Sequence, residues 1–480
     1  MIIAMYDYII VGAGISGLYA AYNLSKHNKS FLLLEKNSSL GGTWKSIKYK
    51  DSLFELGPNT IIDSSKDLQL LIEDLELESE VLKCPLKESK RYIFDGTELQ
   101  ELSSNPLSLL FSGLISTGGF LDFLFKFFSL TQSSKVKIND EEFQKGESVR
   151  DFAERNFGKD ITRKLLETFL KGVWAGDPEK LSADYALKIL AQMEKEHGSI
   201  FKALLSKFGK SKAKSKAKSI ISFKEGLQSL CTAIVNKIAA ENIALNSKVN
   251  KIELEADKYI VETSSGEETK SFQAKNIIFA SKSFEVAELL GAIAPDLSEE
   301  LNEIYYAPIA LFAYSLPKSA FSKDLDGFGY LSAAEEFKTL GSIWASQLFP
   351  ERNLDDEYVF LSFIGGAKNQ EILELSEDCL WNQYIIPEQK RVYGKFLAKP
   401  LNDFDFKLLA SKKITRAIPQ LNIGHAEINS KIKSLLQNKY PNIHLLGNYM
   451  EGVAIKDALE SVHTLDLETQ DTFQEALTTA

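Results

Sequence analysis

The feature that most constrains the fold is a glycine-rich loop near the N-terminus, Gly12-Ala13-Gly14-Ile15-Ser16-Gly17. The β-branched residues 8–11 before it predict a buried parallel strand, and the apolar spacing of residues 18–24 after it predicts a helix. Glycines at these three positions allow a tight turn, a close approach of backbone to a diphosphate, and close packing of the helix on the strand. The chain therefore begins like a dinucleotide-binding unit.

A second strand and an acidic residue complete this unit. Residues 31–34 are apolar and predict a strand that ends at Glu35, 18 residues after Gly17. A carboxylate at this place accepts hydrogen bonds from ribose hydroxyls, while the phosphates face the N-terminus of the helix. The motif alone is weak, but strand, helix, strand and acid stand in the required order. We therefore expect a bound dinucleotide.

Two further segments indicate which dinucleotide is bound. Gly41-Gly42-Thr43-Trp44 follows the second strand, and Phe54-Glu55-Leu56-Gly57-Pro58-Asn59-Thr60 comes shortly after. These segments resemble flavoprotein oxidases of the amine oxidase and desaturase superfamily, where the glycine pair nears the diphosphate and the later segment passes the flavin ring. Those families often carry an arginine where Trp44 and Lys45 stand. The resemblance implies FAD and leaves the diphosphate contact at this spot open.

Composition narrows the remaining function classes. The 480 residues suffice for about three domains. With 66 acidic and 56 basic residues the net charge is −10, which argues against a nucleic-acid partner. The five histidines and three cysteines include no pair at metal-ligand spacing, so we expect no metal site and no disulfide framework. The N-terminus lacks the pattern of a secretory signal, which favours a cytoplasmic protein.

Two segments bear on membrane contact. Residues 106–130 are rich in Leu and Phe but interrupted by proline and glycines, which predicts an interfacial or tunnel-lining helical region; a buried pair of core helices is the alternative. The basic run at residues 207–218 predicts a solvated loop, with contact to anionic lipid headgroups as the alternative. Residues 149–169 predict one amphipathic helix, and residues 306–397 a strand-rich region.

Over nearly its whole length the sequence resembles the protoporphyrinogen oxidase family. The segments that carry the resemblance include LKGVWAGDPEKLSADYAL at 170–187, LGSIWASQLFPER at 340–352, AIPQLNIGH at 417–425 and LLGNYMEGVA at 445–454. The resemblance implies an α/β fold with a discontinuous Rossmann-like FAD-binding domain of the glutathione-reductase and amine-oxidase type, an interleaved sheet domain for the substrate, and a helical membrane-binding domain. The implied boundaries are 1–88, 219–285 and 410–470 for FAD, 89–105 and 286–409 for substrate, 106–218 for the membrane, and 471–480 for a tail.

The family's functional residues carry over onto matching positions. Arg91 matches the arginine that pairs with a propionate of the tetrapyrrole, and Gly172 matches the glycine that lies at the substrate near the flavin. Leu331 and Ile343 match an aliphatic pair around one pyrrole ring, and Phe363 matches an aromatic residue that stacks on another. From the residues alone, Arg91 could be a surface charge and the last three could be core residues. The cofactor-binding residues that we expect are Gly12, Ala13, Gly14, Ile15, Ser16, Gly17, Glu35, Lys36, Gly42, Thr43, Trp44, Gly57, Pro58, Asn59, Thr60, Val249, Asn448, Gly452, Val453 and Ala454.

The implied reaction is the six-electron oxidation of protoporphyrinogen IX to protoporphyrin IX, with dioxygen giving hydrogen peroxide, at a membrane surface on the cytoplasmic side. The flavin carries the difficult chemistry, so no catalytic side chain beyond it is expected. Coproporphyrinogen III, with two additional propionates, is the nearest alternative substrate, and further basic residues in the pocket would favour it. A carotenoid desaturase, an amine oxidase, and a flavin-binding assembly protein without turnover are the more distant alternatives. A homodimer is left open.

Overall fold

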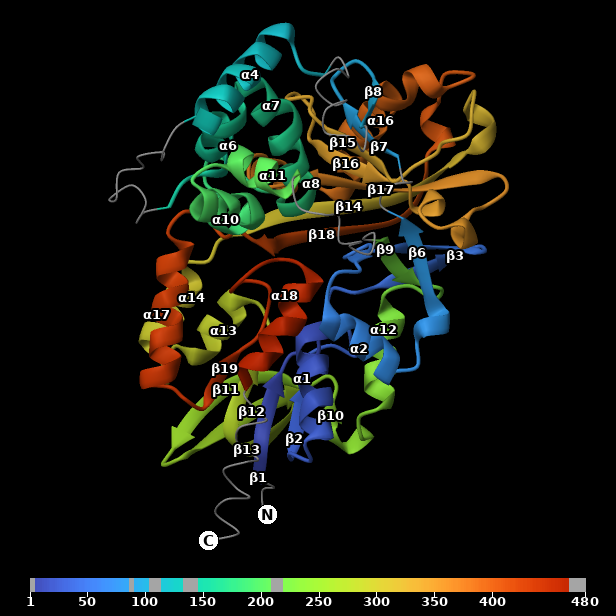
Figure 1. Ribbon diagram of the computed structural model, residues 1–480. Helices are drawn as coiled ribbons and strands as arrows, with labels where there is room; N and C mark the ends of the chain where they lie inside the picture. The colour runs from blue at the N-terminus through green and yellow to red at the C-terminus, as the bar shows by residue number, and fades with distance from the viewer. Residues whose placement is uncertain (1–4, 86–89, 103–113, 133–145, 209–218, 466–480) are drawn as a thin grey trace.

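A computed structural model describes residues 5–85, 90–102, 114–132, 146–208 and 219–465. The chain forms a mixed α/β fold with two large sheets, a helical region beside the second sheet, and helices on both faces of the first sheet (Figure 1). The expected basic loop at 207–218, the C-terminal tail and the first part of the apolar stretch at 106–130 fall mostly outside the described residues.

The first sheet is built from both ends and the middle of the chain. Its strand order is β10-β2-β1-β13-β12-β11, and β19 also pairs with β13. β1 lies parallel to β2 and β13, which confirms the strands expected at 8–11 and 31–34. The strands are β1 (Met5–Val11), β2 (Phe31–Leu34), β10 (Ile243–Ala244), β11 (Lys248–Glu255), β12 (Lys258–Ser265), β13 (Glu268–Phe279) and β19 (Ile443–Leu445).

Successive side chains of β1 point to opposite faces of the sheet, and both faces are buried, so alternate residues pack in two different cores. Tyr8 and Ile10 pack with α1, α2, α12 and α18, whereas Ile9 and Val11 pack with α13, α14 and α17. These helices are α1 (Ile15–Lys26), α2 (Lys66–Asp74), α12 (Gln228–Asn236), α13 (Ser283–Leu290), α14 (Pro295–Asn302), α17 (His425–Asn438) and α18 (Ile455–Glu460).

The second sheet has the order β18-β14-β17-β16-β15-β7-β8. β7 and β8 pair antiparallel and form a hairpin around residues 95–96. β7 pairs parallel with β15 and so joins a sheet formed mainly by much later residues. The strands are β7 (Arg91–Phe94), β8 (Leu99–Leu102), β14 (Tyr306–Pro317), β15 (Gly329–Ser332), β16 (Thr339–Ile343), β17 (Glu357–Gly365) and β18 (Lys407–Pro419).

Two sequence expectations about this region differ from the structure. β18 pairs with β14 in the second sheet, although the expected boundary at residue 410 assigned most of it to the FAD-binding part. The strand-rich region expected at 306–397 is confirmed as far as Gly365, where β17 ends. Beyond it, α15 (Glu377–Leu380), a π-helical segment at Trp381–Ile385 and α16 (Ile386–Tyr393) pack on one face of the sheet through Trp381, Ile385 and Tyr393. Two small sheets, β3 (Ser46–Tyr49) with β4 (Ser52–Glu55), and β5 (Ile61–Ile62) with β9 (Ser219–Phe223) and β6 (Val81–Pro85), complete the sheet structure.

The helical region contains α4 (Thr117–Gln132), α6 (Val149–Phe157), α7 (Lys159–Ile161), α8 (Glu167–Trp174), α9 (Ala183–Ala186), α10 (Lys188–His197) and α11 (Ile200–Phe208). The single helix expected at 149–169 is wrong. Gly158 breaks it with φ of +86°, a left-handed value that favours glycine, and a Cβ at this position would lie 2.3 Å from the Asp122 carboxylate on α4. A π-helical segment at Thr162–Leu166 follows before α8 begins.

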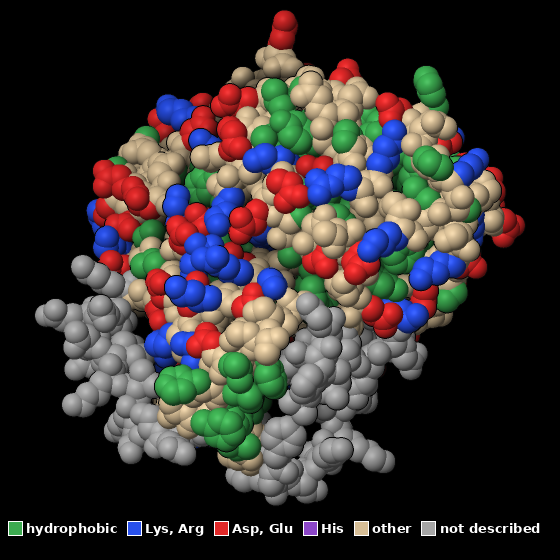
Figure 2. All heavy atoms as spheres, turned by 90° about the horizontal axis from the view of Figure 1, so that it is seen from above, with side chains coloured by type: hydrophobic (Ala, Val, Ile, Leu, Met, Phe, Trp, Pro, Cys, Tyr) green, Lys and Arg blue, Asp and Glu red, His purple; other side chains and the backbone are tan. Residues whose placement is uncertain are grey.

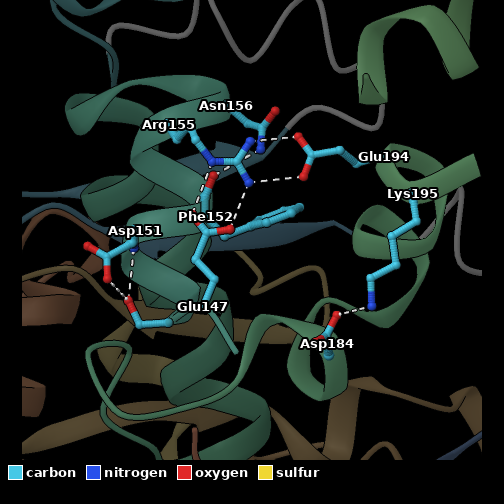
Figure 3. A network of polar contacts seen from close by, with 9 residues as sticks. Glu147, Asp151, Phe152, Arg155, Asn156, Asp184, Glu194 and Lys195 are labelled. Carbon is cyan, nitrogen blue, oxygen red and sulfur yellow. Dashed lines mark hydrogen bonds and ion pairs between the residues drawn. The ribbon is translucent and has the colours of Figure 1, made fainter. Parts of the chain in front are cut away.

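A network of ion pairs holds this region together (Figure 3). The Arg155 guanidinium on α6 binds Glu147 through Nε at 3.0 Å and Nη2 at 2.7 Å, and binds Glu194 on α10 through Nη1 at 2.7 Å and Nη2 at 3.0 Å. Burial lowers the pKa of Arg155, but the hydrogen bonds to both carboxylates outweigh burial and raise the pKa above its ordinary value. The fork of one arginine therefore fixes α6 against α10.

Candidate functional site

The main cavity of the first sheet lies where β1, β2 and β13 end. Its volume is about 690 Å³. The glycine loop after β1, residues 34–37 at the end of β2, the segments 41–44 and 247–250, residues 280–282 after β13, and residues 447–448 after β19 line it. Ligands bind outside the carboxyl ends of parallel strands in open α/β sheets, and this cavity occupies that place.

The glycine loop has the geometry that a diphosphate needs. Gly12 has φ of +105°, and a Cβ there would lie 2.9 Å from the Ala280 carbonyl oxygen. A Cβ on Gly17 would lie 2.0 Å from the Gly12 carbonyl oxygen, so only glycine lets α1 approach the loop. A Cβ on Gly14 would meet nothing within 4 Å. The backbone of Gly14, which is the N-cap of α1, therefore faces open space beside the N-terminus of the helix.

Glu35 is buried at the end of β2 and tied to the same loop. Its Oε2 accepts a hydrogen bond from the Ala13 backbone N–H at 2.9 Å, and its Oε1 accepts from the Asn37 backbone N–H at 2.9 Å. Oε1 also accepts from the Asn37 side-chain amide at 2.6 Å, whereas Oε2 has a further lone pair that can accept from a ribose hydroxyl. The loop and the acid that the sequence motif pairs are thus fixed relative to each other.

The second glycine pair packs directly on the first loop. The Gly41 backbone N–H donates to the Ala13 carbonyl at 2.8 Å, and a Cβ on Gly42 would lie 3.1 Å from the Gly14 Cα. Trp44 is buried and lines the cavity, while Lys45 is exposed. Backbone and the Trp44 ring thus occupy the part of the cavity where the resemblance implies an arginine.

The structure brings most of the expected cofactor residues to one cavity. Those that line it are Gly12, Ala13, Gly14, Ile15, Ser16, Glu35, Lys36, Gly42, Thr43, Trp44, Pro58, Val249, Asn448, Val453 and Ala454. Those that do not line it are Gly17, Gly57, Asn59, Thr60 and Gly452. Three of these five are glycines that permit close packing, because a Cβ on each would lie within about 2.2 Å of a neighbouring oxygen.

Sequence reasoning missed several lining residues after β13. The Ser281 hydroxyl is buried without a hydrogen-bond partner in the described chain, and Lys282 donates to the Arg416 carbonyl at 2.5 Å. Burial lowers the pKa of Lys282. Next to them, Glu285 forms an ion pair with Lys36 at 2.8 Å. The signal that could have found these residues is their position just after a parallel strand.

The expected substrate side chains share one face of the second sheet. Leu331 on β15 lies opposite Ile93 on β7 and Gly341 on β16, and Gly341 lies opposite Phe363 on β17. Paired positions, and positions two residues away, point to the same face of a sheet. Arg91, two residues before Ile93, and Ile343, two residues after Gly341, therefore point the same way as Leu331 and Phe363. The opposite face, with Tyr92 and Tyr330, packs into a separate core.

Part of this face stays accessible to solvent, and we call the partly exposed surface of Leu331, Ile343 and Phe363 the hollow. Leu331, Ile343 and Phe363 are partly accessible although nearly all their strand neighbours are buried. α8 covers one side, where a Cβ on Gly172 would lie 2.4 Å from Leu331 Cδ2. Leu56, which leads into the cavity-lining Pro58, belongs to the same apolar cluster as part of this face. Segment 54–60 therefore connects the hollow with the cavity of the first sheet.

Arg91 is half-buried at the edge of this face, and among the described residues its guanidinium has no carboxylate partner. The group lies over the Phe328 ring, whose centroid is 5.9 Å from the guanidinium carbon. Burial lowers the pKa of Arg91, although the group stays charged. A buried arginine fork without a carboxylate is arranged to receive one from a ligand.

The end of α8 is a tight turn beside this face. Ala175 ends α8 in the left-handed conformation with φ of +47°. Its carbonyl oxygen accepts from the Ala367 backbone N–H at 2.8 Å, which ties the end of α8 to the turn after β17. The turn is therefore kept without glycine at the cost of some backbone strain.

The cavity at the ends of the parallel strands, with its glycine loop and buried acid, has the features of a dinucleotide-binding site. Residues 15–462 match the family described as flavin containing amine oxidoreductase, and the chain belongs to this family. Its cofactor is FAD. The glycine loop, the open space over Gly14 and the Glu35 carboxylate fit that cofactor.

Curated and solved relatives extend over most of the chain. The chain is 30% identical to protoporphyrinogen oxidase 1, chloroplastic, of Arabidopsis thaliana, over 97% of this chain and 88% of that protein. It is 22% identical to coproporphyrinogen III oxidase of Bacillus subtilis, over 94% and 95%. A solved structure from Exiguobacterium sp. 255-15 has a TM-score of 0.77 at 20% identity, with 97% and 98% coverage. Cyclohexylamine oxidase from Brevibacterium oxydans has a TM-score of 0.66 at 16% identity, with 97% and 99% coverage.

Proposed function

We propose that this chain is an FAD-dependent protoporphyrinogen oxidase that converts protoporphyrinogen IX to protoporphyrin IX with dioxygen as the acceptor. The observation that carries the proposal is the shared face of Arg91, Leu331, Ile343 and Phe363. Its apolar part suits the pyrrole rings of a porphyrinogen, and the Arg91 guanidinium, which has no carboxylate partner among the described residues, suits a propionate at the rim. An amine or a carotenoid offers no carboxylate for Arg91.

The chain's own residues bind and orient the substrate. The Arg91 fork holds a propionate, the Leu331 and Ile343 side chains enclose one pyrrole ring, and the Phe363 ring stacks on another. The Gly172 backbone lets the macrocycle approach segment 57–60, where the flavin ring would lie. Bound FAD supplies the hydride acceptor for each of three two-electron oxidations. Three dioxygen molecules then take up six electrons and six protons as three molecules of hydrogen peroxide.

A bound macrocycle would itself exclude water from this face. It would cover the partly exposed Leu331, Ile343 and Phe363 side chains next to α8. Orientation and exclusion are sufficient for this reaction, because the acceptor is the cofactor and no nucleophile is needed. The reaction therefore needs no catalytic acid or base from the chain.

The test is turnover by variants that retain FAD. Arg91→Ala and Phe363→Ala should each lower kcat/KM for protoporphyrinogen at least about tenfold while flavin content stays at the wild-type level. Lys90→Ala is the matched control for the first, because this exposed neighbour pairs with Asp326 at 3.0 Å. Phe404→Ala is the control for the second, because its side chain is fully exposed. Full activity in both hollow variants would refute the site.

We also propose that the helical region docks on the surface of a membrane at the cytoplasmic side. Leu121, Phe125 and Phe128 on α4 are 60%, 73% and 58% exposed and recur at the spacing of one helix face. Figure 2 shows hydrophobic side chains gathered there at the lower edge of the view. Phe169 and Val173 on α8 are exposed as well. Among the described helices, none is long and apolar enough to cross a membrane.

A stripe of this kind lies in the interface with its apolar side among the acyl chains. Co-sedimentation with phosphatidylcholine and phosphatidylglycerol vesicles tests it. Phe125→Ser should lower the membrane-bound fraction, whereas Phe404→Ser, which changes an equally exposed ring outside the helical region, should leave it unchanged. Equal binding by both variants would contradict the proposed docking surface.

A further inference from the structure

A lysine beside the proposed substrate site has no assigned role. Lys171 directly precedes Gly172 on α8, and α8 packs on the face of β15 that carries Leu331. The charged groups around Lys171 are Glu167, Arg150, Glu335 and Lys368. Glu335 follows the end of β15 and Lys368 follows the end of β17. The Ala175 carbonyl at the end of α8 accepts from the Ala367 backbone N–H at 2.8 Å, so α8 ends beside the turn after β17. Lys171, one turn earlier, therefore lies toward the edge of the sheet where these two strands end.

Among the described residues, the Lys171 ammonium group has no ion-pair or hydrogen-bond partner, whereas the neighbouring Lys368 pairs with Asp177 at 4.0 Å. Glu167, one turn before Lys171, is already bound by Arg150 at 2.7 Å. In the described chain, no carboxylate lies within ion-pair distance of Lys171, although the side chain is partly buried and burial lowers its pKa. An unpaired, partly desolvated ammonium group costs stability unless a ligand supplies the negative charge.

Arg91 and Lys171 approach the hollow from different elements. Arg91 lies two residues before the row of Ile93, Leu331 and Phe363, about 7 Å along the strands. Lys171 lies beyond the other end of that row, toward Glu335 and Lys368. A substrate held by both residues would therefore present carboxylates at two separate edges.

This arrangement distinguishes two porphyrinogens. Protoporphyrinogen IX carries propionates on two adjacent rings and vinyl groups on the other two, so its carboxylates lie along one edge. Coproporphyrinogen III carries a propionate on every ring, so a second edge is also acidic. We propose that Lys171 is a specificity residue that receives a propionate of coproporphyrinogen III at the edge opposite Arg91, and that this chain therefore also accepts coproporphyrinogen III. This inference rests on the proposed function.

The experiment compares the wild type, Lys171→Met, Lys171→Arg and Lys180→Met, all loaded with FAD. Lys180 is the matched control, because it is an exposed lysine in the turn after α8. Two readouts are taken for each protein: kcat and KM for both porphyrinogens, and the Kd of the oxidised porphyrins coproporphyrin III and protoporphyrin IX from their absorption shift. Binding is thus measured independently of turnover.

Loss of one charge-assisted contact should weaken binding about tenfold. Lys171→Met should therefore raise the KM for coproporphyrinogen III and the Kd of coproporphyrin III about tenfold, with protoporphyrinogen values within about threefold of the wild type. Lys171→Arg should restore most of this difference, and Lys180→Met should match the wild type. An equal loss on both substrates, or none on either, would overturn the inference.

Failure of the two proposals can be told apart. A wild type that oxidises protoporphyrinogen but neither binds coproporphyrin III nor oxidises coproporphyrinogen III would overturn the role of Lys171 alone. A wild type that holds FAD but binds and oxidises neither tetrapyrrole would overturn the proposed function itself, and the role of Lys171 with it.

Discussion

Replacement of Gly14 by alanine should separate cofactor binding from folding. Gly14 has φ of −72° and ψ of 178°, a conformation open to any residue, and a Cβ there would meet nothing within 4 Å. Because alanine restricts the unfolded chain, the apoprotein should become more stable by about 0.4 to 1 kcal/mol. The new methyl group would stand in the space that the diphosphate needs. Losing one hydrogen bond to a charged group costs about 1.5 to 3 kcal/mol, so FAD affinity should fall roughly tenfold to 150-fold.

The assay pairs urea unfolding of the apoprotein with titration of FAD followed by quenching of flavin fluorescence. Gly17→Ala is the contrasting variant, because its Cβ would lie 2.0 Å from the backbone oxygen of Gly12, which cannot move away without shifting the loop. It should lose about 3 kcal/mol of stability or more. A Gly14→Ala protein that binds FAD with the wild-type Kd would refute the path of the diphosphate over Gly14.

Three other changes test separate parts of the structure. Arg155→Met leaves Glu147 and Glu194 without their partner and should lower stability by about 3 kcal/mol, seen as a lower Tm; an unchanged Tm would contradict the role of the network. Burial lowers the pKa of His444 to about 4, so the wild type should lose about 2 kcal/mol of stability as pH falls from 6.5 toward 4. In urea unfolding at pH 7 and 4.5, His444→Phe should lose less stability than the wild type. Equal losses in the two proteins would contradict this role of His444. Gly172→Ala should leave stability within about 1 kcal/mol but push Leu331 into the hollow and lower kcat/KM about tenfold; unchanged kinetics would place the substrate elsewhere.

The sequence predicted best what is local. The βαβ unit at residues 8–35 follows from hydrophobic period, glycine positions and one acid within a short stretch, and β1, α1 and β2 stand where these patterns indicate. Helix ends were harder to predict, because Gly158 ends a helix with a left-handed backbone that leaves no room for a Cβ beside Asp122 on α4. The strand-rich region was predicted correctly up to Gly365 but not beyond it, since α15 and α16 gain their stability by packing on the sheet.

The residues of the hollow could be predicted from the sequence, but their arrangement on one sheet face could not. β7 pairs with β15, which lies more than 200 residues later, and this register is what brings Arg91 and Leu331 to one face. Hydrophobic pattern alone assigns Leu331, Ile343 and Phe363 to a core, and only their partial exposure in buried strands reveals a hollow. The sequence could not single out Lys171. What distinguishes this lysine is that no carboxylate of the described residues lies within ion-pair distance of it, and this depends on packing.

The central claim is that this chain uses FAD to oxidise a porphyrinogen. Its most direct test is to mix the purified, FAD-loaded protein with colourless protoporphyrinogen IX under anaerobic conditions, admit air, and follow porphyrin fluorescence against a sample without protein. The account predicts porphyrin formation well above the spontaneous rate, with one molecule of hydrogen peroxide for each two electrons removed. A protein that retains its flavin but forms porphyrin no faster than the sample without protein would contradict the account.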